Sequence, residues 1–564
     1  MLTLSSEKSL ARFISIGAFL TTVVVIWGSV TDPVNTPKLF ILGSAAFAAG
    51  AIAFAMGAKE LWRTSRLWLI GSILFIVFSI SAIVNSPSPL VQNIYGSYGR
   101  NTGFVTYLSL LLIATAATLI RRKSNFNLII YSLFAAGVTN VAYCLWAIAF
   151  GDFIGWNNPY GSILGTFGNP NFIGAFLGIF ITALAAYVVA PGISWKYRGL
   201  ALITVAIGLF EIKESHAVQG LVVSAAGFSI IGFYFIRSKF KSNLILAGYT
   251  VVIAVLGFIS LMGALQKGPF TSFIYKTSVS LRGEYWQAGW NMASQFPFTG
   301  VGMDAYGDWY RRARDEQALI LPGPETVTNA AHNIPFDILS NGGWPLFITY
   351  VFLIALVTIA IIKVTVRNKN YDGTFIALAV AWACYQIQSV ISISQIGLAI
   401  WGWVLSGVVI AYEIATRGSG TTGSSAPSKP KREKEQIFSA TAIGGIGLVV
   451  GALIVVPPLS SDMKWKSAIT KGDLALVKAA LVPSYMTPTD TNRLLNMVSI
   501  LENSKLPDVA YEYAKKAVEF NPESFDSWRT LYAVTNSTVQ DKELALSNMK
   551  RLDPKNSNPL NTPK

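Results

Sequence analysis

Residues 343–366 read GWPLFITYVFLIALVTIAIIKVTV, an apolar run in which Lys363 is the one charged residue. A helix needs about 20 such residues to cross a bilayer core of about 30 Å. Because lipid cannot satisfy unpaired backbone groups, a run of this kind must be helical. Comparable runs lie at about 11–30, 37–58, 67–84, 102–120, 127–150, 171–190, 199–213, 217–236, 244–264, 373–392, 395–414 and 437–457. The sequence therefore predicts an all-α fold, a polytopic transmembrane helical bundle of about 12–13 spans.

The composition and the charge pattern support the same fold class. Hydrophobic residues make up 52% of the 564 positions and charged residues 13%, against about 25% charged in ordinary soluble domains. Lys and Arg number 44 against 29 Asp and Glu. The Lys and Arg residues gather in short loops after alternate runs, and the positive-inside rule assigns such loops to the cytoplasm. The excess of positive charge therefore indicates membrane topology, not nucleic-acid binding. Cys144 and Cys384 both lie within apolar runs, so no disulfide framework is predicted.

The alternation of runs and loops divides the chain into consecutive segments. We expect N-terminal transmembrane helices over residues 1–264, a long extracytoplasmic loop over 265–342 and further transmembrane helices over 343–415. Residues 416–436 have the composition of a flexible cytoplasmic linker. An additional transmembrane helix at 437–457 then carries residues 461–564 to the outer side, where we expect an extracytoplasmic helical domain.

The C-terminal segment has a repeat-like pattern. Ala510, Ala514 and Ala517 recur at helical spacing before Asn521-Pro522. Residues 510–528 resemble the tetratricopeptide helix-pair repeat, which would make the segment a stacking or partner-binding module. The alternative is a small helical cap without a partner.

The long outer loop contains the first candidate site residues, in the stretch LRGEYWQAGWNMASQFPFTGVG at residues 281–302. Arg282 precedes an expected helix over residues 283–295, and a guanidinium binds phosphate oxygens in a two-pronged geometry. The alternative is an interfacial arginine that reaches toward lipid headgroups. Gly300 and Gly302 mark a tight turn or a place where the backbone approaches a ligand.

Both histidines lie in outer loops. His332, in AAHNI before an expected helix, can accept a proton as a general base near neutral pH; alternatively it only hydrogen-bonds the backbone at the helix start. His216 and Gln219 lie in KESHAVQG, the short link between two spans. The histidines lack the ligand spacing of metal sites, so no metal is predicted.

Two further outer cations are candidates for substrate binding. Arg100 begins a span, and Arg311 belongs to a basic run at residues 311–314. We expect this run on one face of an amphipathic helix that lies on the membrane, with headgroup anchoring as the alternative to substrate binding. Several outer cations beside the bilayer suit a lipid that carries a diphosphate.

The segment from Arg282 to Gly302 resembles the O-antigen ligase and O-antigen polymerase superfamily. In that family an arginine begins a helix that carries a tryptophan, here Trp286, and a Pro-hydrophobic-Thr-Gly-hydrophobic-Gly turn follows. Ala331-His332-Asn333, together with NGGWP at residues 341–345, resembles the histidine segment of the same family.

The resemblance implies a membrane glycosyltransferase of polysaccharide biosynthesis in the cell envelope. Such an enzyme moves a glycan from a polyprenyl (undecaprenyl) diphosphate carrier to an acceptor hydroxyl, on the outer face of the bacterial cytoplasmic membrane, without a metal or cofactor. Arg282 would hold the diphosphate and His332 would assist the acceptor, with Trp286, Gly300, Gly302 and Asn333 in the surrounding substrate-binding motifs. A polymerase of lipid-linked repeat units and a protein O-oligosaccharyltransferase remain alternatives.

One departure from the family pattern concerns the short link, where the family usually has an arginine. His216 or Gln219 occupies that position, and a neutral side chain supplies no full positive charge. Arg100 or Arg311 would then have to compensate.

Two functions of other classes remain as rivals. A transporter of lipid-linked glycans predicts ionisable residues at mid-membrane depth, of which the spans have few. A non-catalytic membrane scaffold predicts that the C-terminal repeats are the working part, so that deletion of residues 461–564 abolishes all function.

Overall fold

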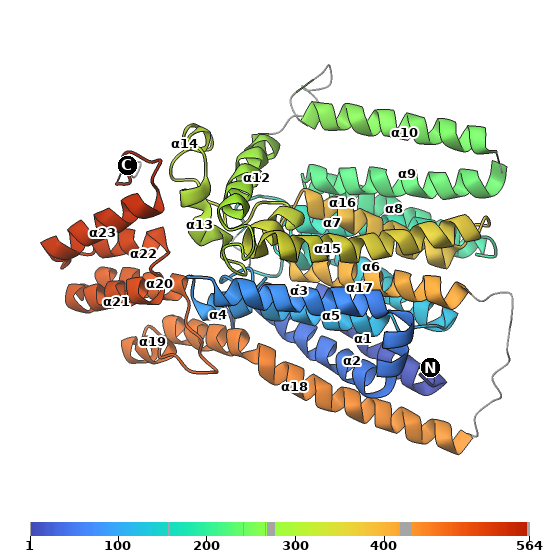
Figure 1. Cartoon of the computed structure of the whole chain (residues 1–564), viewed down its shortest axis with the longest axis horizontal. Helices are drawn as coiled ribbons and strands as arrows, with labels where there is room; N and C mark the ends of the chain where they lie inside the picture. Colours follow the sequence, from blue (N-terminus) through green and yellow to red (C-terminus); the bar gives the residue numbers. More distant parts are fainter. Residues whose placement is uncertain are drawn as a thin grey trace.

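The computed structural model describes residues 2–155, 158–240, 242–264, 267, 277–417 and 430–560. These residues form 22 α-helices and one short 3-10 helix, and the part of the chain described contains no named strand. The predicted all-α fold class is confirmed. Figure 1 shows most of the helices side by side in one elongated bundle.

Thirteen helices correspond to the predicted runs. They are α1 (Leu4–Val23), α2 (Asn35–Thr64), α3 (Arg66–Val84), α5 (Phe104–Ala117), α6 (Lys123–Phe150), α7 (Pro170–Val188), α8 (Trp195–Glu214), α9 (Val218–Phe240), α10 (Asn243–Ala264), α15 (Ile334–Arg367), α16 (Gly373–Val390), α17 (Ile396–Thr416) and α18 (Pro430–Lys471). Among the described helices, ten are long and apolar enough to cross a membrane, and α5 is a shorter apolar helix. The chain is therefore a polytopic helical bundle.

Basic loops and the N-terminal helix meet at one end of the bundle. Nη1 of Arg122, between α5 and α6, lies 2.7 Å from Oε2 of Glu7 on α1. Nη2 of Arg121 lies 3.7 Å from Oε1 of Glu60 near the end of α2. The chain begins at this end, on the right in Figure 1. Two of the loops predicted to be cytoplasmic therefore lie on the same side as the N-terminus.

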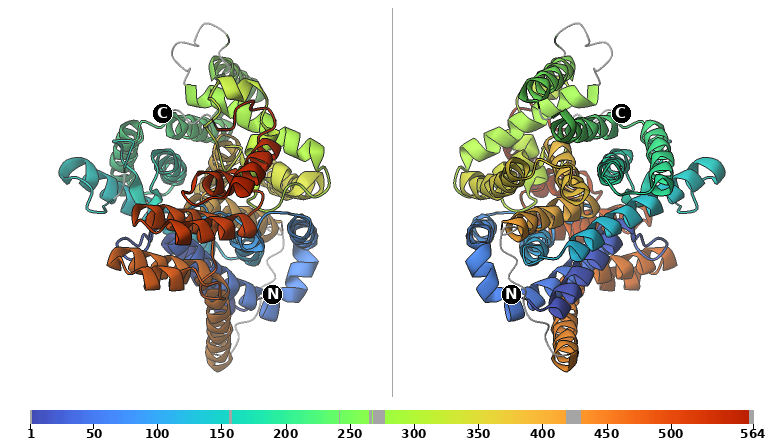
Figure 2. Two further views of the ribbon diagram at one scale, coloured as in Figure 1. Left: turned by 90° about the vertical axis from the view of Figure 1, so that its left-hand side faces the viewer. Right: turned by 90° about the vertical axis from the view of Figure 1, so that its right-hand side faces the viewer.

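The opposite end carries the outer helices and the C-terminal helices (Figures 1 and 2). The outer helices are α4 (Leu90–Tyr95), α12 (Thr277–Gln295), α13 (Tyr306–Ala313) and α14 (Gln317–Ile320), with the 3-10 helix η1 (Gly165–Phe167). The C-terminal helices are α19 (Leu474–Ala480), α20 (Thr491–Asn503), α21 (Pro507–Phe520), α22 (Phe525–Ala533) and α23 (Val539–Leu552). The C-terminal helices have a hydrophobic core of their own, which includes the three alanines of the repeat-like pattern. Their assignment as tetratricopeptide repeats stays a prediction.

Helix α18 connects the helical bundle with the C-terminal helices. It packs along α2, where a Cβ atom on Gly451 would lie 2.7 Å from the carbonyl oxygen of Gly43, so glycine permits this close approach of two backbones. The helix runs on to Lys471, so residues 461–471 of the predicted C-terminal domain continue the same helix. Residues 418–429 of the predicted linker, and residues 265–266 and 268–276 of the predicted outer loop, lie outside the described residues.

Candidate functional site

The outer loop is fixed to the bundle at a break in α15. Gly343 has a left-handed φ of 67°, which interrupts the helix, and Trp344 donates its backbone N–H to the carbonyl oxygen of Pro297 (2.8 Å). The backbone N–H groups of Val301 and Gly302 donate to carbonyl oxygens of residues 340 and 341, each at 3.0 Å. These bonds hold the end of α12 against the start of α15.

Close packing leaves no room for a side chain at Gly300 or Gly302. Gly300 has φ 62°, and a Cβ there would lie 2.4 Å from backbone atoms of Asn341 and Gly342. Gly302 has φ 115°, and a Cβ there would collide with the hydroxyl of Ser86. Both glycines therefore lie in a turn that packs closely against the protein's own backbone and a neighbouring loop, in agreement with the predicted tight turn.

His332 lies at the start of α15 in a left-handed backbone conformation, with φ 55°. For a residue other than glycine this conformation is uncommon, and the surrounding contacts must hold it. The backbone N–H of Ala331 donates to Oδ1 of Asp337 (2.6 Å), and the side chain of Asn333 caps α15 by accepting from the N–H of Phe336 (3.2 Å). The imidazole is partly buried against the ring of Tyr285, with 5.4 Å between centroids.

Arg282 and Arg100 are the charged neighbours of this imidazole. Burial, and then the positive charges of Arg282 and Arg100, lower the pKa of His332 from 6.5 to about 4. The ring is therefore neutral near pH 7 and can accept a hydrogen bond or a proton. The structure thus brings together three of the predicted site residues, which come from segments far apart in the sequence.

The two arginines differ in their partners. Nε of Arg100 lies 3.8 Å from Oδ1 of Asp304 and has no hydrogen-bond partner among the described residues. Arg282, on α12, forms no ion pair with any residue that the structure describes, and Tyr285 is the titratable group beside it. Burial lowers the pKa of Arg282. No carboxylate of the described residues therefore offsets its charge.

Two aromatic side chains of α12 complete the surroundings. Trp286 stacks on Phe336 at 6.0 Å between centroids and 8° between planes, which packs α12 against α15. Tyr285 was not singled out from the sequence, although it lies three residues after Arg282 and so on the same helix face. Its carbonyl accepts a hydrogen bond from the hydroxyl of Tyr306 (2.6 Å), and its ring contacts His332.

His216 and Gln219 belong to a second cluster, at the turn between α8 and α9. His216 is exposed, and its Nδ1 lies 3.3 Å from Oγ of Ser162. Gln219 is 5% exposed, and both polar atoms of its side chain lack a hydrogen-bond partner among the described residues. The same is true of both carboxylate oxygens of Glu211, a residue that the sequence reading did not select. Arg282 and Arg100, the two arginines near His332, do not come from the turn between α8 and α9.

The basic run on α13 requires a correction. Arg311 is 5% exposed and Arg314 is fully buried, and both guanidiniums reach Oδ2 of Asp553 at 3.4 Å and 2.6 Å. Arg312 lies 2.5 Å from a carboxylate oxygen of Glu523. The expectation that this run lies on a membrane is wrong, because all three guanidiniums face the C-terminal helices. Its amphipathic pattern reflects a contact within the chain.

The described residues contain no group of three or more His, Cys, Asp or Glu side chains that could hold a metal ion. A family model for O-antigen ligase matches residues 203–351, from α8 into α15. This match includes Arg282 and His332, and it confirms the resemblance to the O-antigen ligase and polymerase superfamily. No curated protein matches the chain.

Proposed function

We propose that this chain, with its O-antigen ligase domain at residues 203–351, transfers a glycan from a polyprenyl diphosphate carrier to an acceptor hydroxyl. One observation carries the proposal: Arg282 and Arg100 lie near enough to His332 for their charges to lower the pKa of its imidazole, and Arg282 has no carboxylate partner among the described residues. A diphosphate is an anion that two guanidiniums can bind, and a neutral imidazole is a base that an acceptor hydroxyl requires.

In the proposed reaction the acceptor oxygen attacks the anomeric carbon of the lipid-linked glycan. The new bond between carbon and acceptor oxygen forms as the bond between that carbon and the diphosphate oxygen breaks, and the diphosphate leaves with the electron pair. His332 takes the acceptor proton. Arg282 stabilises the charge that develops on the diphosphate, a contribution of about 3–4 kcal/mol for a well-oriented group.

Substrate binding would also improve the base. The positive charges of Arg282 and Arg100 help to lower the pKa of His332 in the free protein. A bound diphosphate would offset these charges, so the pKa of His332 would rise toward its ordinary value and proton transfer would become more favourable. Binding of the donor is thereby coupled to activation of the acceptor.

The proposed location is the outer face of the bacterial cytoplasmic membrane. The basic loops that carry Arg121 and Arg122 lie at the end of the bundle where the chain begins, whereas α12 lies at the other end (Figure 1). The positive-inside rule assigns the basic end to the cytoplasm. The site and the C-terminal helices would then lie on the extracytoplasmic side of the membrane, the side on which the proposed glycan transfer takes place.

The test uses the full-length protein reconstituted in lipid, with the lipid-linked glycan that accumulates in cells lacking the gene as donor. Arg282→Ala and His332→Ala should each lower glycan transfer at least about a hundredfold. Lys213→Ala, which removes an exposed cation near the outer link (79% exposed side chain), is the matched control and should transfer normally. Near-normal transfer by both site variants would contradict the proposal.

A further inference from the structure

A cavity of about 220 Å³ lies between the outer loops and the C-terminal helices. Its walls come from residues 91–98, residues 307–329 and residues 489–526. A single water needs only ~10–15 Å³ of such space, so the cavity can admit a ligand group. Neither Arg282 nor His332 lines it.

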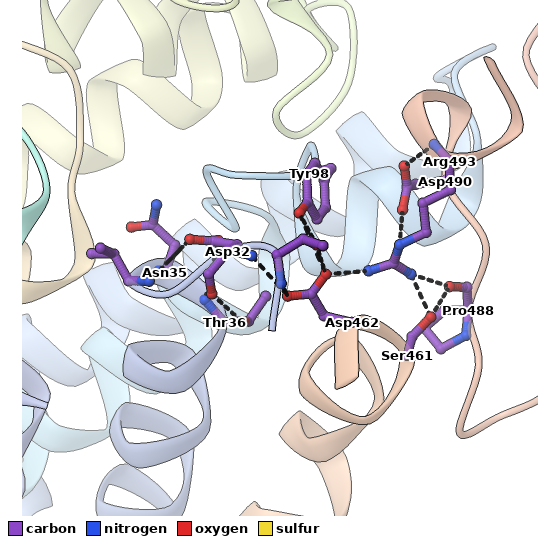
Figure 3. A network of polar contacts seen from close by, with 11 residues as sticks. Asp32, Asn35, Thr36, Tyr98, Ser461, Asp462, Pro488, Asp490 and Arg493 are labelled. Carbon is purple, nitrogen blue, oxygen red and sulfur yellow. Dashed lines mark hydrogen bonds and ion pairs between the residues drawn. The ribbon is translucent and has the colours of Figure 1, made fainter. Parts of the chain in front are cut away.

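Ion pairs around Arg493 hold one wall of the cavity in place. The Nη2 atom of Arg493 lies 3.3 Å from Oδ1 of Asp462, and its Nε lies 3.1 Å from Oδ2 of Asp490. Asp462 also accepts a hydrogen bond from the backbone N–H of Thr31 (2.9 Å). Figure 3 shows Arg493 between the two carboxylates, with the hydroxyl of Tyr98 directed toward Asp462. Because Tyr98 and Asp490 line the cavity, this network fixes two of its walls to each other.

A second set of ion pairs surrounds Arg311. Arg311 lines the cavity and is paired with Asp553 and, at 3.6 Å, with Glu325. Arg529 of α22 lies 3.0 Å from Glu325 as well. Two separate sets of ion pairs therefore attach the C-terminal helices to the loops that form the cavity.

The lining is rich in hydroxyl and amide groups. They belong to Gln92, Ser97, Thr328, Asn329, Thr491 and Asn492. Such groups both donate and accept hydrogen bonds, as the hydroxyl groups of a sugar do. Thr489, another lining residue, is 6% exposed, and its Oγ1 has no hydrogen-bond partner among the described residues. A buried hydroxyl without a hydrogen-bond partner favours a ligand or water molecule that can form the missing hydrogen bond.

The charges of the lining disfavour a phosphate. Asp308, Asp490 and Asp526 line the cavity against one guanidinium, that of Arg311. Arg311 is already paired with Asp553, Asp490 with Arg493 and Asp526 with Arg529, so the lining offers no unpaired guanidinium among the described residues. An anionic diphosphate would therefore gain little here, whereas an uncharged, hydroxyl-rich group needs no counter-charge.

The cavity adjoins the candidate active site through two shared segments. Ser97 lines the cavity and donates its backbone N–H to Oδ2 of Asp304 (2.8 Å), the carboxylate that faces Arg100. Asn329 lines the cavity and precedes His332 by three residues. Two chain segments therefore contribute both to the cavity and to the surroundings of the candidate active site.

We propose that this cavity is a glycan subsite, which binds uncharged sugar units of the acceptor or donor chain beyond the reacting sugar. The inference rests on the proposed function and makes the C-terminal helices part of the glycan-binding surface. The wall residues of α20 would contribute to substrate affinity without taking part in the chemical step.

The test measures binding of a free oligosaccharide to the full-length protein in detergent. The probe is the oligosaccharide released by mild acid from the lipid-linked glycan of cells lacking the gene. Asn492→Trp, which fills the cavity from α20, should weaken binding at least about tenfold. Asn503→Trp, at the exposed far end of the same helix, is the matched control and should bind like wild type. Arg282→Ala should also bind normally, because the probe has no diphosphate.

Asn329→Trp, from the opposite wall, repeats the test if Asn492→Trp does not fold. Equal affinity of both filled variants and wild type, or no binding by any of them, would overturn the subsite. Binding of a peptide rich in serine and threonine in place of the oligosaccharide would indicate a protein acceptor and overturn it as well.

Transfer kinetics distinguish the two glycan sources and the two proposals. A KM raised about tenfold for the acceptor in Asn492→Trp would assign the cavity to the acceptor chain, and one raised for the lipid-linked donor would assign it to the donor chain. A wild-type protein that binds the probe at this cavity but transfers no glycan would retain the subsite and refute the proposed function.

Discussion

Two groups of arginines lie at the same end of the molecule and differ in what faces them. Arg311 of α13 and Arg314, directly after this helix, are buried and share the carboxylate of Asp553. Arg282 of α12 has no carboxylate partner among the described residues, and its charge helps to lower the pKa of His332. An arginine paired with a carboxylate of another domain joins the two domains, whereas an arginine without such a partner is available to a substrate.

The electrostatic consequence differs accordingly. A buried ion pair is costly to break, because removal of one partner leaves an uncompensated charge in a medium of low dielectric constant. An arginine without a carboxylate partner stays charged and has unused donors, so an anionic ligand gains most from it. Loss of stability should therefore follow changes at α13, and loss of transfer should follow changes at α12.

The largest effect is expected at Asp553, which is fully buried. Asp553→Ala would leave two buried guanidiniums short of a counter-charge, at a cost of about 3–5 kcal/mol. Limited proteolysis and hydrogen exchange of the full-length protein should show that the C-terminal helices loosen. Glu543→Ala, at an exposed site on α23, the helix that ends just before Asp553, is the control. Equal protection of the two variants would contradict a joining role for the α13 arginines.

The next effect concerns the shape of the guanidinium. Arg282→Lys keeps the charge but loses the two-pronged grip on a diphosphate, so transfer should fall nearly as far as in Arg282→Ala, at least about a hundredfold. The thermal midpoint should change little, because Arg282 forms no ion pair with the described residues. Arg551→Lys, a partly exposed site paired with Glu523, serves as the control. Retention of most transfer activity in Arg282→Lys would show that a two-pronged contact with the diphosphate is not required.

A third prediction concerns the protonation of His332. Its pKa is lowered to about 4, so the imidazole of the folded protein stays neutral while that of the unfolded chain is protonated below about 6.5. This group therefore favours folding more as pH rises from about 4 to about 6.5, and its contribution is lost as pH falls through that window. Arg282→Gln removes a positive neighbour and should raise the pKa of His332.

Proton NMR of the imidazole can follow this titration, because the chain has only two histidines. A His216→Gln background leaves the signal of His332 alone. Arg100→Gln should raise the same pKa by less, since burial and Arg282 are the larger causes of its lowering. A pKa that is unchanged in Arg282→Gln would show that the two groups do not face each other.

The smallest effect is expected at Asn333, which caps α15 through its side chain. Asn333→Ala should destabilise the protein by about 1 kcal/mol, and Asn333→Asp should restore the cap. Transfer per folded molecule should remain near that of wild type in both variants, as measured by the transfer assay and thermal unfolding. A large loss of transfer in Asn333→Asp would instead indicate contact with substrate, as the sequence motif suggested.

Much of the fold could be predicted because hydrophobic run length is a local property. Each of the 13 predicted runs corresponds to a helix, although only ten of these helices meet the length and apolarity that a span requires. The order of charged loops likewise predicted that residues around Arg121 and the N-terminal helix lie together, and Arg122 is paired with Glu7 there. The break at Gly343 was not foreseen, because it depends on the turn at Pro297 that bonds to it.

The candidate site was only partly predictable. Sequence motifs selected Arg282 and His332, and the structure brings them together with Arg100. Tyr285 was missed, although helical spacing from Arg282 could have indicated it. The motifs also included Arg311, whose guanidinium is engaged by Asp553, a residue more than 200 positions later.

By itself, the sequence determined that this chain is an all-helical membrane protein with a long polar loop, since burying apolar side chains and pairing backbone groups are requirements that each segment meets locally. Only the tertiary structure decided which arginines are neutralised and which remain open, and it alone formed the cavity between the outer loops and the C-terminal helices. The reason is that charge pairing and cavities depend on residues that meet only when the chain is folded.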